Sequence, residues 1–182
     1  MKIAVYCSST ENLPEVWQRA AWAVGHWIGE HKSQLIYGGV DAGLMRVVAG
    51  ACKESGGTVV GIVPSRRANM ESPFNDLSVP TADLNDRKRV MQLLADTVVV
   101  LPGGYGTLDE FATSFAYINF TLQRSKRLIL LNSEGIYDPL LAQLQLMIDR
   151  GLMNADRMSV MVVANTTEEL IQALDNRFNE KK

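Results

Sequence analysis

A glycine-rich stretch in the middle of the chain has the residue types of a phosphate-binding loop. Residues 102–110 read PGGYGTLDE and directly follow the apolar run 97–101, TVVVL. Gly103, Gly104 and Gly106 carry no Cβ, so the turn can take positive φ values and its N–H groups can approach an anion. A helix that starts here adds unpaired N–H groups and the positive end of its dipole. The stretch predicts a site for a phosphorylated small molecule, although glycines are equally typical of tight strand-to-helix turns.

Two explanations fit Glu110, the acidic residue that ends this motif. Glu110 follows Thr107 by three residues, which is the spacing of a capping box at a helix start. Alternatively, its carboxylate acts on a neutral part of the ligand, such as a hydroxyl group. The helix predicted over 106–122 has a polar face of Glu110, Thr113, Ser114 and Tyr117 and an apolar face of Leu108, Phe111, Ala112 and Phe115.

Arg87 has an unusual position for a charged residue. In the helix predicted over 84–95, Arg87 shares a face with the apolar residues Val90, Met91 and Leu94, at the spacings i+3, i+4 and i+7. An arginine on such a face either extends its head group to solvent, forms a structural ion pair, or meets a buried anion with its fork of donors. The pattern slightly favours a ligand role over a structural pair.

Other polar or glycine-rich turns follow the first two predicted strands. The first strand ends in the residues 7–10, CSST, which include Ser9, and the second is followed by Gly38 and Gly39. Neither glycine turn matches the dinucleotide fingerprint GxGxxG, and the phosphate-loop pattern GxxxxGK[ST] does not occur in the sequence. An NAD enzyme and a P-loop NTPase are therefore disfavoured.

Short apolar runs alternate with longer helical patterns along the chain, which indicates an α/β fold. The predicted strands are 3–7, 34–37, 58–63, 97–101, 127–131 and 159–163, and the predicted helices are 14–30, 42–55, 84–95, 106–122, 136–150 and 167–178. This alternation predicts a doubly wound parallel sheet with helices on both faces, in one domain over 1–182. Sites in such sheets lie at the carboxyl ends of strands. The stretch 64–83 is rich in Ser, Asn and Pro and is predicted to be a long loop.

Composition excludes several classes of function. The formal net charge is −2 with scattered Lys and Arg, which disfavours binding to nucleic acid or an anionic membrane. Two cysteines, Cys7 and Cys52, give no disulfide framework or CxxC pair, and His26 and His31 stand apart from acidic clusters, so neither a metal site nor a catalytic triad is expected. The absence of a signal peptide or an apolar run of about 18 residues predicts a cytoplasmic protein.

Six motifs together resemble the LONELY GUY family of cytokinin riboside 5′-monophosphate phosphoribohydrolases, many of which carry the label lysine decarboxylase. The motifs are CSST at 7–10, YGGxxxGLM at 37–45, GxVxGIxP at 57–64, DRKxxM at 86–91, PGGYGTLDE at 102–110 and LLNxxGxYDPLL at 130–141. The chain departs from the family pattern at Ser8, Val40 and Arg46, and over 115–119. Nothing in the sequence marks a pyridoxal-phosphate lysine.

The resemblance implies a Rossmann-like fold and hydrolysis of the N-glycosidic bond of a nucleoside 5′-monophosphate, AMP or an N6-modified AMP, without a cofactor. Arg87 and Glu110 would be the catalytic pair. The substrate-binding residues would be Lys88, Gly103, Gly104, Gly106, Thr107, Gly38, Gly39, Ser9 and Met91. Family members form dimers, and the aromatic residues of 106–122 face several directions, which also predicts a homodimer. The alternative is a non-enzymatic carrier or sensor of a nucleotide or of the molybdenum cofactor, with the same fold.

Overall fold

A computed structural model describes residues 1–121 and 125–180 of the chain. Its strands are β1 (Lys2–Tyr6), β2 (Gln34–Tyr37), β3 (Thr58–Pro64), β4 (Leu77–Thr81), β5 (Thr97–Val100), β6 (Arg127–Leu131) and β7 (Met161–Ala164). Its α-helices are α1 (Glu15–Glu30), α2 (Gly43–Glu54), α3 (Leu84–Leu94), α4 (Tyr105–Phe120), α5 (Asp138–Asp149) and α6 (Thr167–Asn179). Short 3-10 segments are η1 (Ser65–Met70), η2 (Ser133–Gly135) and η3 (Ala155–Val160). The predicted helix over 106–122 thus ends at Phe120, and residue 122 lies outside the described residues.

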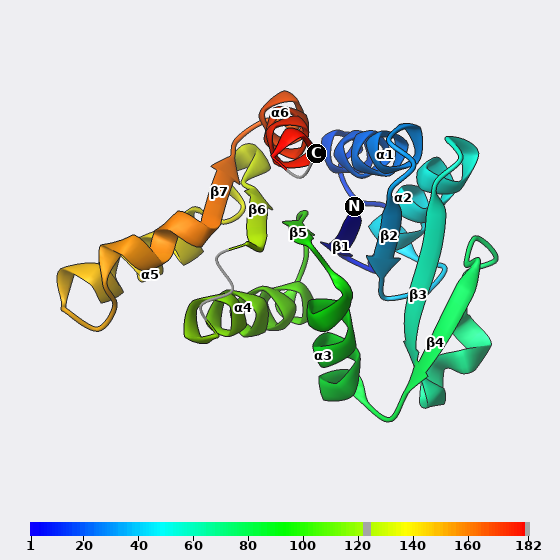
Figure 1. The fold of residues 1–182 in the computed structure, drawn as a ribbon, viewed down its shortest axis with the longest axis horizontal. Coiled ribbons are helices and arrows are strands. Elements are labelled where there is room, and N and C mark those ends of the chain that lie inside the picture. The colour runs from blue at the N-terminus through cyan, green and yellow to red at the C-terminus, as the bar shows by residue number, and fades with distance from the viewer. Residues whose placement is uncertain (122–124, 181–182) are drawn as a thin grey trace.

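The strands form one parallel sheet in the order β4-β3-β2-β1-β5-β6-β7. The chain winds outward from β1 to β4 and then returns to β5, which pairs with β1 on its other side (Figure 1). The direction of winding therefore reverses between β1 and β5. Ligands of open α/β sheets bind at such a reversal, outside the carboxyl ends of the two strands.

Helices cover both faces of the sheet, which confirms the predicted α/β, Rossmann-like, doubly wound architecture. One core cluster contains side chains of α1, α2 and α6, and the other contains side chains of α3, α4 and α5. In Figure 1, α1 and α6 lie on one face, and α3 and α4 lie on the other. Strand β1 shows the alternation behind this arrangement, because Ile3 and Val5 belong to the first cluster whereas Ala4 and Tyr6 belong to the second.

The prediction of one long loop over 64–83 is wrong. This stretch contains η1 and the edge strand β4, which pairs in parallel with β3. Only Thr81 of β4 is buried, so the strand lacks the apolar run that identifies the central strands. Pro80 is tolerated because an edge strand leaves one of its sides without ladder hydrogen bonds.

Within the described ranges, none of the helices is both long and apolar enough to cross a membrane.

Candidate active site

A cavity of about 280 Å³ opens at the reversal point between β1 and β5. It is lined by Cys7, Ser8, Ser9, Thr10, Met45, Leu84, Arg87, Gly104, Tyr105, Gly106, Thr107 and Glu110. These residues come from the turn after β1, from the first turns of α2, α3 and α4, and from the loop after β5. Segments far apart in the sequence therefore meet at the edge of the sheet where the sequence predicted a site.

The first turn of α4 has the form of an anion cradle. Gly104 is the N-cap of α4, and no described side chain caps this helix. A helix leaves the N–H groups of its first turn without intrahelical partners, and its dipole is positive at this end. A Cβ added at Gly104 or Gly106 would meet no protein atom within 4 Å. The positive φ expected for this turn is wrong, because Gly103, Gly104 and Gly106 all have other backbone conformations. Protein packing thus does not require glycine at positions 104 and 106, whereas a close-lying ligand would.

Gly103 has a different role in the same loop. A Cβ on Gly103 would lie 2.1 Å from Oγ1 of Thr107, a buried side chain. Glycine at this position lets the Thr107 hydroxyl pack against the loop backbone. Gly103 therefore shapes the cradle, while Gly104, Gly106 and Thr107 line the cavity.

The turn after β1 forms the wall next to the cradle. The Ser8 N–H donates to the Pro102 carbonyl at 3.2 Å, and the Leu44 N–H donates to the Ser8 carbonyl at 3.0 Å. Ser8 is thus fixed to the loop after β5 and to the start of α2. Its Oγ accepts from the Thr10 N–H at 3.0 Å, which shapes the turn. Burial raises the pKa of the neighbouring Cys7 thiol far above its ordinary range, so this thiol stays neutral and is a poor nucleophile.

Helix α3 brings Arg87 to the cavity floor. Asp83 caps this helix by accepting from the N–H groups of Asn85 and Asp86, at 2.8 and 2.9 Å, so Arg87 falls in its first turns on the face toward the sheet. Arg87 is only 8% exposed. Its Nε is buried and has no hydrogen-bond partner within the described part of the chain. Glu110 therefore does not satisfy every donor of the Arg87 guanidinium.

Arg87 forms a buried ion pair with Glu110. An NH2 donor of Arg87 hydrogen-bonds to the Glu110 carboxylate, and Glu110 is only 6% exposed. Burial raises the pKa of Glu110 above its ordinary value, while the charge and hydrogen bond of Arg87 oppose that shift. The capping-box explanation for Glu110 is wrong, because α4 already begins at Tyr105 and both Thr107 and Glu110 lie inside the helix.

The buried face of α4 also differs from the predicted one. Phe111 and Phe115 are buried as expected, but Leu108 and Ala112 are exposed, and Ser114 is buried instead. Ser114 accepts from Gln92 Nε2 at 3.2 Å and shares a hydrogen bond of 2.9 Å with the Tyr6 hydroxyl. The predicted polar face already placed Ser114 with Glu110 on one side of the helix, but the sequence did not show that this face is buried or that Tyr6 and Gln92 meet it.

Other residues expected at the site lie just outside the cavity lining. Gly38 packs against Met45 and Arg87, since a Cβ there would lie 2.9 Å from Met45 Sδ and 3.1 Å from an Arg87 nitrogen. Gly39 has a φ of +70° and touches Gly61, which accounts for glycine without a ligand. Met91 is fully buried in the core, and Lys88 pairs with Asp109.

Six lining residues were not among the predicted site residues: Cys7, Ser8, Thr10, Met45, Leu84 and Tyr105. Leu84, at the start of α3, and Tyr105, the first residue of α4, both border the cavity with largely exposed side chains. Tyr105 lies inside the motif PGGYGTLDE and Leu84 lies two residues before the motif DRKxxM, and these positions were the available signal. The structure thus brings Arg87, Glu110, Ser9, Gly104, Gly106 and Thr107 together around one space.

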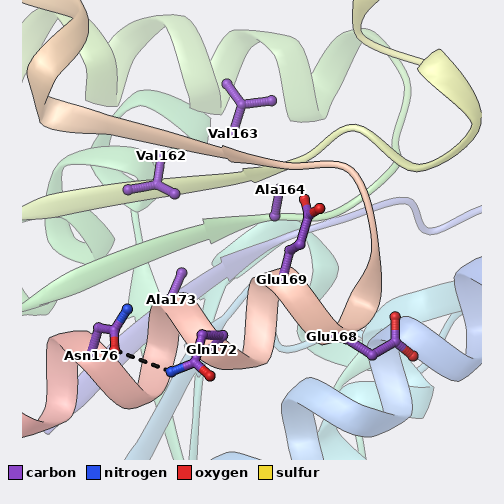
Figure 2. Close-up of a pocket in the computed structure, with 8 residues that line it drawn as sticks. All are labelled: Val162, Val163, Ala164, Glu168, Glu169, Gln172, Ala173 and Asn176. Carbon is purple, nitrogen blue, oxygen red and sulfur yellow. Dashed lines mark hydrogen bonds between the residues drawn. The ribbon is translucent and has the colours of Figure 1, made fainter.

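A larger hollow of about 530 Å³ lies elsewhere, between the edge strand β7 and α6 (Figure 2). Its polar lining includes the carboxylates of Glu168 and Glu169 and a Gln172–Asn176 hydrogen bond of 3.1 Å. Hydrogen bonds from the backbone N–H of Glu168 and from Thr166 lower the pKa of Glu168, so this wall is negatively charged. A phosphorylated ligand therefore fits the cavity at α4 better than this hollow.

No group of three or more metal-ligating side chains occurs among the residues that the structure describes.

Comparison with known proteins assigns the chain to a family. The family model described as "Possible lysine decarboxylase" matches residues 45–174. The cytokinin riboside 5′-monophosphate phosphoribohydrolase LOG of Oryza sativa subsp. japonica is 31% identical over 182 residues, covering 98% of this chain and 74% of the relative. LOG5 of Arabidopsis thaliana has the same activity in its name. It is 31% identical over 177 residues, which cover 96% of this chain and 77% of the relative.

Solved structures share the fold. The molybdenum cofactor carrier protein of Chlamydomonas reinhardtii has a TM-score of 0.74 at 23% identity and covers 98% of both chains. At this identity the likeness concerns the fold alone. The motifs, the relatives that match nearly the whole of this chain, and the family model agree. The chain belongs to the LONELY GUY family, whose family model bears the description of a possible lysine decarboxylase.

Proposed function

We propose that this protein hydrolyses the N-glycosidic bond of a nucleoside 5′-monophosphate, AMP or an N6-modified AMP, to the free base and ribose 5-phosphate. The observation that carries the proposal is the buried Arg87–Glu110 pair, which borders the same cavity as the open first turn of α4. Relatives at 31% identity are named for phosphoribohydrolase activity on cytokinin riboside 5′-monophosphates, which supports the reaction class.

The 5′-phosphate binds at the start of α4 in this proposal. The N–H groups of Gly106 and Thr107 and the positive end of the helix dipole face the phosphate, which meets no Cβ at Gly104 or Gly106. Arg87 lines the same cavity and adds the positive charge of its guanidinium group. Phosphate contacts of this kind hold the sugar in register, so that remote binding energy assists the reaction at the glycosidic bond.

Glu110 acts on the ribose. When water attacks C1′, the C1′–N bond breaks with its electron pair passing to the base, and positive charge develops on the sugar in an oxocarbenium-like transition state. The Glu110 carboxylate stabilises this charge and accepts a proton of the attacking water, while the departing base takes up a proton from solvent, so that the products are the neutral base and ribose 5-phosphate. Its burial makes the electrostatic interaction strong, because little water screens it. Arg87 keeps Glu110 oriented and stabilises negative charge on the phosphate or the departing base.

A non-enzymatic carrier is the second candidate, and the fold likeness to the molybdenum cofactor carrier supports it. A carrier needs an anion cradle but has no use for a carboxylate buried against an arginine beside it. A carboxylate next to a bound phosphate weakens binding unless it serves another part of the ligand. The Arg87–Glu110 pair therefore favours the hydrolase.

The proposal includes a homodimer in the cytoplasm. Phe120 on α4 and Leu152 after α5 are exposed by 86% and 79%, and they border a mostly apolar hollow of about 460 Å³. Exposed apolar surface of this kind is typical of a protein interface. Both cysteines are free and buried, as suits a reducing compartment. A monomeric mass in light scattering at micromolar concentration would contradict the dimer.

A chromatographic screen tests the activity. The purified protein is incubated with AMP, CMP, GMP, UMP and N6-prenylated AMP, and the released base is measured against Glu110→Gln, with the folding of both proteins checked by circular dichroism. We expect base release by the wild type and a loss of two to four orders of magnitude, on the order of one acid–base or electrostatic group, in the variant. Binding of AMP without release of base from any nucleotide would favour the carrier.

A further inference from the structure

Two ion pairs lie next to each other between α3 and α4. The consecutive residues Arg87 and Lys88 of α3 face the consecutive residues Glu110 and Asp109 of α4, and each cation pairs with one carboxylate. Lys88 Nζ donates to both carboxylate oxygens of Asp109, at 2.8 and 2.6 Å. Arg87 and Glu110 line the cavity, whereas Lys88 and Asp109 do not. The function proposed above uses only the first pair.

The second pair is unequal in burial. The Lys88 side chain is 11% exposed, while that of Asp109 is 57% exposed. A solvated carboxylate loses little when its partner is removed. A buried ammonium group without a counter-ion is costly, so Lys88 would turn to another carboxylate if Asp109 were absent. Its long, flexible stem permits that movement.

Glu110 is the buried carboxylate next to this pair, and the charge of Lys88 acts both on Glu110 and on the exposed carboxylate of Asp83 at the start of α3. Glu110 is adjacent to Asp109 in the sequence, and both members of the second pair act on it: the negative charge of Asp109 raises the pKa of Glu110, and the positive charge of Lys88 lowers it. Arg87, which already binds Glu110, also lowers its pKa. Burial, and to a smaller extent the charge of Glu110, raise the pKa values of Tyr6 and Cys7 on and after β1. A second cation on Glu110 would compete with Arg87 and with the ribose.

We infer that Asp109 is a positioning residue, which holds the Lys88 ammonium away from Glu110 and so leaves the Glu110 carboxylate free for Arg87 and the substrate. Asp109 acts through Lys88 and touches no substrate in this account. The inference rests on the proposed function for its consequence in catalysis. Its structural part, the location of Lys88, is independent of any activity.

The kinetic test compares four variants with AMP as substrate. Asp109→Asn should lower kcat by about ten- to hundredfold, the size of effect that misplaced groups cause. Asp109→Glu keeps the charge and should retain most of the activity. Asp149→Asn, which removes an exposed carboxylate of α5 far from the cavity, is the matched control. In the double variant Asp109→Asn, Lys88→Met, the competing cation is gone, so kcat should rise above that of Asp109→Asn alone.

Stability measurements separate positioning from a general loss of structure. Removing Lys88 relieves an unpaired buried charge in either case, so the Tm of every variant is measured and kcat is compared at a temperature at which all of them are folded. A double variant no more active than Asp109→Asn under these conditions would overturn the inference. A crystal structure of Asp109→Asn without nucleotide gives the independent answer. Lys88 Nζ within hydrogen-bond distance of a Glu110 carboxylate oxygen supports the inference, and Lys88 at any other place overturns it. If the wild type hydrolyses no nucleotide, the proposed function fails and this crystal structure still decides the inference.

Discussion

Replacing Gly106 by alanine should separate the stability of the protein from its ability to bind phosphate. Gly106 is the second residue of α4, its φ is not positive, and a Cβ there would meet no protein atom within 4 Å. Alanine in a helix is favoured over glycine by roughly 0.5–1 kcal/mol. For a chain of this size, that gain raises the Tm by about 1–4 °C. The folded variant should therefore be at least as stable as the wild type.

The same methyl group should weaken nucleotide binding. It projects into the space that the proposed function assigns to the 5′-phosphate, and a lost hydrogen bond to a charged group costs about 1.5–3 kcal/mol. That free energy corresponds to a KM for AMP raised by about 10- to 150-fold. The assay is base release at varied AMP concentration, with calorimetric titration of AMP as an activity-independent check. Adenosine, which lacks the phosphate, should bind both proteins equally weakly.

Gly103→Ala is the matched control in the same loop. Its Cβ would lie 2.1 Å from Thr107 Oγ1, so it should lower the Tm instead of raising it. If Gly106→Ala binds AMP as tightly as the wild type, the phosphate does not occupy the first turn of α4, and the account of the cradle is refuted. A Gly106→Ala protein with a clearly lower Tm would refute the reasoning about open space at this position.

Three further predictions concern the floor and the frame of the site. Arg87→Lys, which cannot reproduce the fork of donors, should lower kcat/KM about 100-fold, and wild-type kinetics would contradict a bidentate role. Burial raises the pKa of Glu110 above its ordinary value of 4.5, and Glu110 must be ionised to act as a base. The pH profile of kcat/KM should therefore fall on the acid side at a pH above 4.5, where Glu110 takes up a proton. A fall that occurs only at pH 4.5 or below would contradict this assignment. Gly39→Ala should lower the free energy of unfolding by more than about 1 kcal/mol, because Gly39 has a φ of +70° and the new Cβ would lie 2.9 Å from the Gly61 backbone. The loss should appear as a lower Tm, and an unchanged Tm would contradict the strain.

The sequence predicted the fold well because the central strands are continuously apolar. Strands β1, β2, β3, β5 and β6 are buried on both faces, so their runs of Val, Ile and Leu stand out between helical patterns. Strand β4 escaped prediction for the opposite reason. It is a half-exposed edge strand that contains Pro80, and its pairing with β3 is a tertiary fact that no local pattern records.

The site was predicted in part. The glycines and Arg87 carried a local signal, since an arginine on an apolar helix face needs a partner and the glycines follow a buried strand. Local reasoning failed at Glu110, where the spacing to Thr107 imitates a capping box although the helix starts earlier, at the N-cap Gly104. The pairing of Lys88 with Asp109 could not be predicted, because it depends on how α3 and α4 lie against each other.

The most direct test of the central claim is a crystal structure of the Glu110→Gln variant with AMP bound. The account predicts the 5′-phosphate within hydrogen-bond distance of the Gly106 and Thr107 N–H groups, and C1′ of the ribose beside the position 110 side chain and Arg87. AMP bound outside the cavity, or with its base at the start of α4 and its phosphate elsewhere, would contradict the account.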